Sequence, residues 1–164
     1  MRLTAAAVLA LAIAGCGQAA APPTPPAPAS VPCGPSEVLT RHDHAHLAIL
    51  IRGQLRTVPA FIGITATQIC WLHTHDTSGI VHVEAGDQRT FTLGDFFGVW
   101  RQPLSKTAIG SDRAGGGESV RATVNQQAYA DAPETIVLLD HEDIVLQLGP
   151  PFLQIQPYVW PPGY

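Results

Sequence analysis

Residues 44–51 read HAHLAILI, and this stretch decides how the rest of the chain is organised. Hydrophobic side chains occupy both alternating positions, a pattern typical of a strand that is buried on both faces. Residues 52–54 (RGQ) follow as a turn, and residues 55–58 return as a second strand. Pro59 ends that strand because proline lacks the donor that a sheet needs. The sequence therefore predicts a hairpin built on residues 44–51.

Further elements follow along the chain. Residues 71–75 and 80–84 predict two strands joined by a turn at 76–79, where Gly79 suits a positive φ. Residues 92–100 predict a short helix that Thr92 caps, with Asp95 in its first turn. Strands are also predicted at 120–124, 136–139 and 144–148, with a turn at 140–143 and an extended proline-rich tail from 149. The fold class expected is mostly β, as antiparallel hairpins with one short helix in a small β-rich α+β domain.

The amino terminus has the pattern of an export signal. A single cation, Arg2, precedes an apolar run over 5–14, which is too short to remain as a bilayer-spanning helix of about 20 residues. Residues 13–16 (IAGC) resemble a bacterial lipobox, in which cleavage precedes a cysteine that becomes acylated. The sequence predicts a signal peptide over 1–15 and lipidation of Cys16. The alternative is an ordinary secretory signal cleaved elsewhere.

Residues 16–32 join this anchor to the remainder of the chain. They are rich in proline and alanine and carry no charge, so they favour extended polyproline conformations over a packed core. We expect a tether here and one globular, histidine-rich domain over 33–164. The expected location is the bacterial envelope, in the periplasm on the outer membrane or on the outer face of the plasma membrane.

The domain holds two cysteines, Cys33 and Cys70. Export to an oxidising compartment makes a disulfide the expected state of such a pair, and two buried thiols are the alternative. The bond would stabilise the fold by roughly 3–4 kcal/mol. The net charge of the chain is −4, and no basic face is visible, so nucleic acid is not an expected partner.

Histidines are the most informative residues. The chain has seven, and six of them fall in two short blocks: His42, His44 and His46, then His73, His75 and His82. Residues two apart on a strand share a face. If residues 76–79 close a hairpin, His73 lies opposite His82, and His75 and Glu84 share that face. Because each block follows a cysteine, the disulfide would draw the two blocks together.

This pattern predicts a metal site. An isolated His-x-His is often only a surface feature, but two such units with a facing histidine are typical of metal ligation. The predicted ligands are His42, His44, His73, His75 and His82. His46 is either a ligand or a core histidine. Glu84 is expected to orient a histidine, with direct ligation of the metal as the alternative, and Asp76 either does the same or caps the turn. His141, in an acidic turn, is expected to be solvated.

The ligand types narrow the choice of metal. The mature domain has no methionine, which argues against a thioether-rich Cu(I) site. An oxidised Cys33–Cys70 pair would leave no thiolate, so a blue-copper site requires Cys70 to be free. Imidazoles suit Cu(II), Zn(II), Ni(II) and Fe(II), and the order of affinities favours copper where it is available. We expect copper or zinc.

Four stretches carry a resemblance to known proteins: HDHAHLAILIRG, VPAFIGI, LHTHDTSGIVHVE and FTLGDFFGVW. They resemble a poorly characterised family of exported bacterial proteins with an HTHD-x-x-G-I-x-H-V-E signature. The resemblance covers residues 42–104 and, more loosely, 140–149. The spacing is also weakly similar to that of cupins. Glu84, however, follows His75 by nine residues instead of three or four, and the second cupin histidine is lacking unless His141 serves.

These observations leave three classes of function. A tethered module that captures, buffers or delivers copper or zinc needs only the histidines and the tether. A metal-dependent hydrolase or oxidoreductase would also need an open coordination position and an acid or base such as Glu84 or Asp76. A structural envelope lipoprotein would bind no metal. The sequence favours the binding module over an enzyme.

Overall fold

The computed structural model describes residues 31–164 of the chain. The predicted signal peptide, the lipidation of Cys16 and nearly all of the tether fall on residues 1–30, outside the described residues. Within the described part, no helix is both long enough and apolar enough to cross a membrane.

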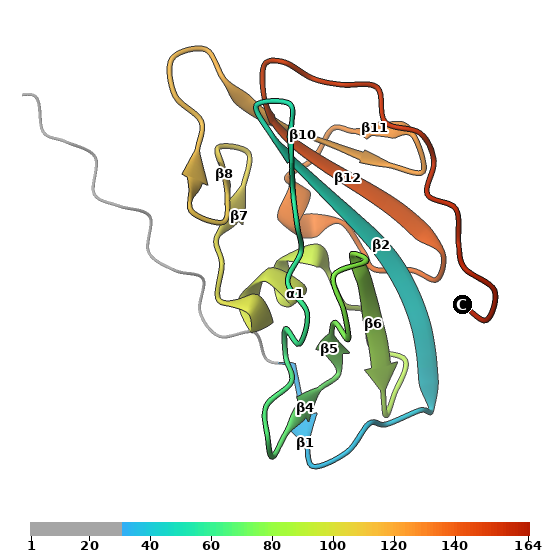
Figure 1. Cartoon of the computed structure of the whole chain (residues 1–164). Coiled ribbons are helices and arrows are strands. Elements are labelled where there is room, and N and C mark those ends of the chain that lie inside the picture. Colours follow the sequence, from blue (N-terminus) through green and yellow to red (C-terminus); the bar gives the residue numbers. More distant parts are fainter. Residues whose placement is uncertain (1–30) are drawn as a thin grey trace, which may run out of the picture.

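A seven-stranded sheet forms the centre of the domain (Figure 1). Its middle strand, β2 (Arg41–Ile51), contains the HAHLAILI stretch. The strand order is β11-β10-β12-β2-β6-β5, and β3 pairs with the end of β2 beside β6. The other strands are β3 (Gln54–Arg56), β5 (Leu72–His73), β6 (Ile80–Ala85), β10 (Ser119–Val124), β11 (Gln127–Tyr129) and β12 (Glu142–Gly149). The mostly β fold class with one short helix is confirmed.

The two central strands depart from the antiparallel expectation. Strand β12 runs parallel to β2 from Glu142 to Leu148, whereas every other pairing in this sheet is antiparallel. A parallel pair needs a long crossover connection, and here about ninety residues separate the two strands. Hairpin patterns in the sequence report only local pairings, so they do not indicate this one.

The two faces of the sheet differ in chemistry. Odd-numbered residues of β2, such as Leu47 and Ile49, are buried in the apolar core together with Phe96 and Phe97 of the helix α1 (Leu93–Trp100). The small sheet β7 (Leu104–Ser105), β8 (Ala108–Ile109) and β9 (Asp112–Arg113) lies on the same side (Figure 1). Even-numbered residues of β2 point to the opposite face because side chains alternate along a strand. That second face carries the histidines.

The helix α1 forms as the sequence predicts. The Thr92 hydroxyl accepts a hydrogen bond from the Asp95 backbone N–H, and the Asp95 carboxylate accepts one from the Thr92 backbone N–H. This reciprocal arrangement satisfies donors that the first helical turn leaves unpaired. The helix ends at Arg101, which adopts a left-handed conformation.

The prediction of a strand at residues 136–139 is wrong. The chain there leaves a short 3-10 turn, η1 (Pro133–Thr135), and makes one isolated bridge, between Val137 and Thr92. Its apolar residues Ile136 and Leu138 are buried in the core beside the helix instead of in a ladder. The apolar residues of this segment correctly indicated burial, but they did not indicate a strand. The turn predicted at 140–143 is also shorter, because β12 already begins at Glu142.

The hairpin predicted over 71–84 is shorter than expected. Strand β5 ends at His73, and a six-residue connection reaches β6. The backbone of Thr74 leaves the ladder because it hydrogen-bonds to Phe61 and Ile62 of a neighbouring loop. His75 therefore lies outside the ladder, which ends at His73. The pairing of His73 with His82 is confirmed.

Cys33 and Cys70 form the predicted disulfide. They face each other in a two-stranded pair, β1 (Cys33–Gly34) with β4 (Ile69–Cys70). Strand β4 leads directly into β5, so the bond fixes the start of the described chain beside the histidine-bearing edge of the sheet.

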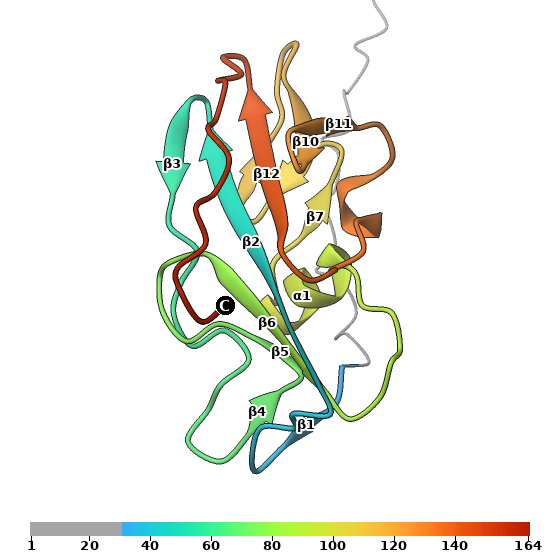
Figure 2. The same cartoon turned by 90° about the vertical axis from the view of Figure 1, so that its right-hand side faces the viewer.

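The tail after β12 crosses the histidine-bearing face of the sheet (Figure 2). It has no strand, as expected, and is held by individual contacts. The Gln147 side chain exchanges two hydrogen bonds with the backbone of Leu153, and the Tyr158 backbone N–H donates to Asp143. Figure 2 shows the carboxyl end lying in front of β2 and β6.

Candidate metal centre

Three neighbouring strands place histidines on one face of the sheet. Strand β6 lies between β2 and β5. In this register His82 of β6 faces His44 of β2 on one side and His73 of β5 on the other, and Glu84 faces His42. The two histidine blocks therefore meet, as the sequence predicts. The direct pairing of β2 with β6 brings the two histidine blocks together. The disulfide, which we expected to do this, joins β1 to β4 instead.

The first group of potential ligands is His73, His75, His82 and Glu84. One ligand atom from each lies within 4.8 Å of all the others. Nε2 of His73 is 3.1 Å from Nε2 of His75 and 3.6 Å from Oε1 of Glu84. Two ligands that each lie 2.0–2.1 Å from a tetrahedral ion are about 3.3–3.4 Å apart. These separations are therefore close to the edges of a tetrahedral coordination shell.

His73 is held in one orientation. Its Nδ1–H donates a 2.8 Å hydrogen bond to the carbonyl oxygen of Cys70, so the lone pair of Nε2 faces the group. A carbonyl that fixes the tautomer of a histidine in this way is a common partner of metal ligands. Burial lowers the pKa of His73 to about 4, although the bond to Cys70 opposes this shift. The side chain is neutral near pH 7, the form that binds metals.

His82 is the central imidazole. Burial, and then repulsion between like charges on the neighbouring histidines His73 and His44, lower its pKa to about 3. Its ring centroid lies 5.1 Å from that of His73, 4.5 Å from that of His75 and 4.7 Å from that of His44. The cluster thus disfavours protons while it concentrates neutral nitrogen donors.

Glu84 occupies a more central position than predicted. Its Oε1 atom lies 3.2 Å from Nδ1 of His82 and 3.3 Å from Nε2 of His42, and the side chain is only 3% exposed. Its Oε2 atom is buried without a hydrogen-bond partner. Burial raises the pKa of this carboxyl group. An unpaired buried polar atom costs about 1–3 kcal/mol, a cost that a bound cation would offset. Glu84 is placed as a ligand as well as an orienting partner.

The second group is His42, His44 and His82, whose ligand atoms also lie within 4.8 Å of one another. The His42 and His44 ring centroids are 4.6 Å apart. His44 is buried, and burial lowers its pKa, with a further contribution from His42. The side chain of His42 is 45% exposed and that of His75, in the first group, is 41% exposed, so each group has one histidine at the surface. All five predicted histidine ligands thus belong to one of the two groups.

Three other predicted residues lie outside both groups. Nδ1 of His46 lies 2.8 Å from Oδ1 of Asp143, and the ring stacks on Tyr158 at 3.6 Å between centroids, which favours the core role of His46. The Asp76 carboxylate accepts the Ser78 backbone N–H, so it caps the turn. His141 is exposed and pairs with Asp140.

Two further residues beside the cluster, Glu37 and Tyr164, were not predicted from the sequence. Oε1 of Glu37 lies 3.6 Å from Nε2 of His75. The ring of Tyr164, at the end of the tail, packs 4.8 Å from that of His44. Glu37 lies only four residues after Cys33, which the disulfide brings towards this edge of the sheet. Nothing local in the sequence indicates where Tyr164 lies.

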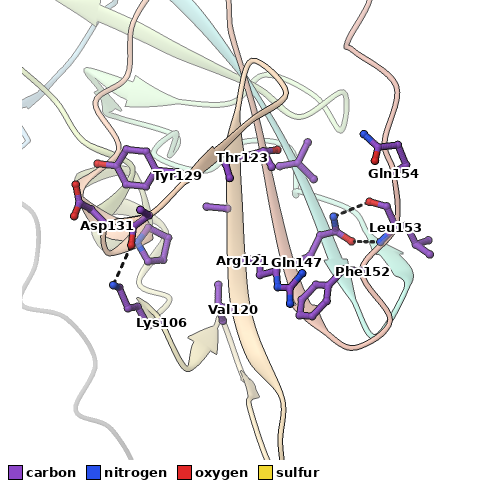
Figure 3. Close-up of a pocket in the computed structure, with 15 residues that line it drawn as sticks. Lys106, Val120, Arg121, Thr123, Tyr129, Asp131, Gln147, Phe152, Leu153 and Gln154 are labelled. Atoms are coloured by element: carbon purple, nitrogen blue, oxygen red, sulfur yellow. Dashed lines mark hydrogen bonds between the residues drawn. The ribbon is translucent and has the colours of Figure 1, made fainter.

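A cavity of about 480 Å³ lies apart from these groups, between β10, β11, β12 and the first part of the tail. Figure 3 shows Lys106, Arg121, Tyr129 and Gln147 among its labelled residues, with Asp131 as their only carboxylate. The concentrated coordination chemistry is therefore in the histidine cluster and not in this cavity.

No protein-family model, no curated protein and no solved structure matches this chain. The functional conclusion consequently depends on the histidine cluster itself, which has the donor atoms and the spacing to hold a metal ion.

Proposed function

We propose that this protein is a membrane-tethered, extracytoplasmic metal-binding lipoprotein that captures, buffers or delivers copper or zinc. The convergence of His73, His75, His82 and Glu84 carries the proposal, because their ligand atoms lie within 4.8 Å of one another. Three of the four residues are buried, and the carboxylate among them has an oxygen without a hydrogen-bond partner.

The donor set supports copper or zinc as the ion. Three imidazoles and one carboxylate form a shell that suits Zn(II) and Cu(II), and both cysteine sulfurs are engaged in the disulfide. Magnesium and calcium prefer shells made of oxygen alone. Affinity for sites of this kind is highest for copper among the first-row divalent ions, so availability in the compartment would select between the two.

The number of protein donors favours binding over catalysis. Structural and storage sites for zinc are closed by four protein ligands, whereas catalytic sites keep one position open for water or substrate. The first group offers four protein ligands, and two of them, His73 and Glu84, are almost completely inaccessible to solvent. This arrangement supports capture of an ion more than turnover of a substrate at it.

The membrane-tethered part of the proposal comes from residues 1–32. The apolar run, the IAGC stretch ending at Cys16 and the uncharged proline-rich segment have the order of a lipoprotein signal and tether. The Cys33–Cys70 disulfide supports it, because such bonds persist in oxidising compartments outside the cytoplasm.

Metal titration of the full chain tests the binding function. Competition with a chromophoric chelator gives the affinity for Cu(II) and Zn(II) in the wild type and in a variant with both His73→Ala and His75→Ala. The variant should lose at least 100-fold in affinity, since it lacks two of four ligands. His141→Ala is the matched control because that histidine is exposed and lies outside both groups; it should bind as the wild type does. Equal affinities in all three proteins would refute the proposal.

A separate experiment tests the anchor. Radiolabelled palmitate should be incorporated into the wild-type chain expressed in a bacterium, and the chain should sediment with membranes. Cys16→Ala should abolish both behaviours while leaving the Cys33–Cys70 disulfide intact. Labelling that persists in Cys16→Ala would contradict the assignment of this residue.

A further inference from the structure

The two ligand groups overlap at one residue, and this overlap has a consequence for the number of ions. We propose that the cluster binds two divalent ions at the same time, with His82 shared between them. The inference rests on the proposed metal-binding function and extends it from one site to a binuclear one.

The number of donors exceeds what one ion can use. Five histidines and Glu84 converge on the same face, whereas zinc in protein sites is almost always four-coordinate. The group around His73 already supplies four ligands. His42 and His44 remain, and with His82 they form a second set whose atoms also lie within 4.8 Å of one another. A single four-coordinate ion held by the first group would leave these two histidines uncoordinated.

The position of His82 suits a shared ligand. It lies on β6, the strand between β2 and β5, and its ring is 4.7 Å from His44 on one side and 4.5 Å from His75 on the other. An imidazole has two nitrogens that point away from each other, but the neutral ring has one N–H and one lone pair. To bind two ions, His82 would release its N–H proton to the adjacent Glu84 carboxylate or to water and bridge the ions as an imidazolate. Nδ1 of His82 is 3.2 Å from Oε1 of Glu84, a member of the first group, so this carboxylate is placed to take the Nδ1 proton when the first ion binds there. Nε2 is then the nitrogen for the second ion.

Carboxylates lie at both ends of the cluster, where two dications would need them. Glu84 is inside the first group, and Oε1 of Glu37 lies 3.6 Å from Nε2 of His75. Beside the second group, the Asp140 carboxylate accepts the backbone N–H of His44 at 3.0 Å. Negative charge is thus distributed along the cluster, which lowers the electrostatic cost of placing a second cation near the first.

Each of the two sites has one exposed histidine. The side chain of His42 is 45% exposed and that of His75 is 41% exposed, whereas His73 has no exposed side-chain surface. Each site can therefore take up an ion from solution through its own exposed histidine, and the buried residue His82 lies between the two sites.

Stoichiometry and spectroscopy of the full chain test this inference. Titration with Cu(II) should give two equivalents per chain in the wild type and one in a variant with both His42→Ala and His44→Ala. His141→Ala, the matched control, should keep two. The fully loaded wild type should show an electron paramagnetic resonance spectrum of two coupled Cu(II) ions, and the double variant that of a single isolated ion. The wild-type spectrum needs no substitution, so it remains informative if the variant fails to fold.

The outcomes separate this inference from the proposed function. One equivalent in the wild type, lost in the His73→Ala/His75→Ala variant, would overturn the binuclear site and leave the metal-binding function intact. Two equivalents without magnetic coupling would also overturn the sharing of His82. No binding at all would refute both.

Discussion

Glu84 provides a sharp test because its contributions to stability and to metal binding should have opposite signs. The carboxylate is 3% exposed, its Oε2 atom has no hydrogen-bond partner, and burial raises its pKa. A carboxyl group whose folded-state pKa is raised destabilises the fold once the pH exceeds that pKa, because the ionised form is buried at a cost. At neutral pH, Glu84 therefore reduces the stability of the metal-free protein.

Glu84→Gln removes the charge and keeps the shape of the side chain. Relief of an unpaired buried charged atom should raise the free energy of unfolding of the metal-free protein by about 1–2 kcal/mol, within the range of such penalties. For a domain of this size, that corresponds to an increase in Tm of roughly 3–8 °C. Metal affinity should fall by at least about tenfold, or 1.4 kcal/mol, because a neutral amide replaces an anionic ligand. Calorimetry without metal and chelator competition measure the two effects.

Glu142→Gln is the matched control for this prediction. Glu142 also has a buried Oε2 atom without a partner, and burial also raises its pKa, but it lies outside both ligand groups. Its substitution should stabilise the fold in the same direction and leave the metal affinity unchanged. If Glu84→Gln instead lowers the Tm of the metal-free protein and leaves the affinity at the wild-type value, Glu84 is a structural residue and the reasoning is wrong.

Three further predictions concern pH, the disulfide and the tail. The pKa of His73 is lowered to about 4 and that of His82 to about 3, so the metal-free protein should lose stability as the pH falls from 6.5 towards 4. The loss in the free energy of unfolding should be at most about 1.4 kcal/mol per pH unit for each histidine. Urea unfolding at a series of pH values measures it, and a flat profile would show that the two side chains are exposed. Reduction of the Cys33–Cys70 disulfide, whose cysteines are 37 residues apart, should lower the free energy of unfolding measured in urea by about 4 kcal/mol. It should also weaken metal binding, because the Cys70 carbonyl orients His73. An unchanged metal affinity after reduction would show that the disulfide does not influence the site. Tyr164→Ala should speed metal transfer to a chelator in stopped-flow measurements, because its ring covers His44, and an unchanged rate would show that the tail does not restrict access.

The local features of this structure could be predicted from the sequence. A period of two along the strands and the length of the connecting turn were enough to place His73 opposite His82. The Thr92 and Asp95 spacing likewise specified the start of the helix. These features depend on residues that lie close together in the chain, where backbone geometry leaves few alternatives.

The parts that the sequence did not reveal depend on contacts between distant segments. The pairing of β2 with β6, which joins His44 to His82, and the parallel pairing of β2 with β12 have no local pattern. Glu84 was predicted to orient a histidine more than to bind the metal, because its burial could not be known beforehand. The neighbours of Glu84 on the adjacent segments of the sheet, His42 on β2 and Trp71 before β5, come from distant parts of the chain.

The coordination shell itself is the most direct test of the central claim. X-ray absorption spectroscopy of the zinc-loaded full chain should show imidazole nitrogen ligands at about 2.0–2.1 Å with carboxylate oxygen, and no sulfur at the longer distance of about 2.3 Å. The His73→Ala/His75→Ala variant should lose imidazole scattering in proportion to the ligands removed. A wild-type spectrum without imidazole, or one identical to that of the variant, would contradict the assignment of the histidine cluster as a metal centre.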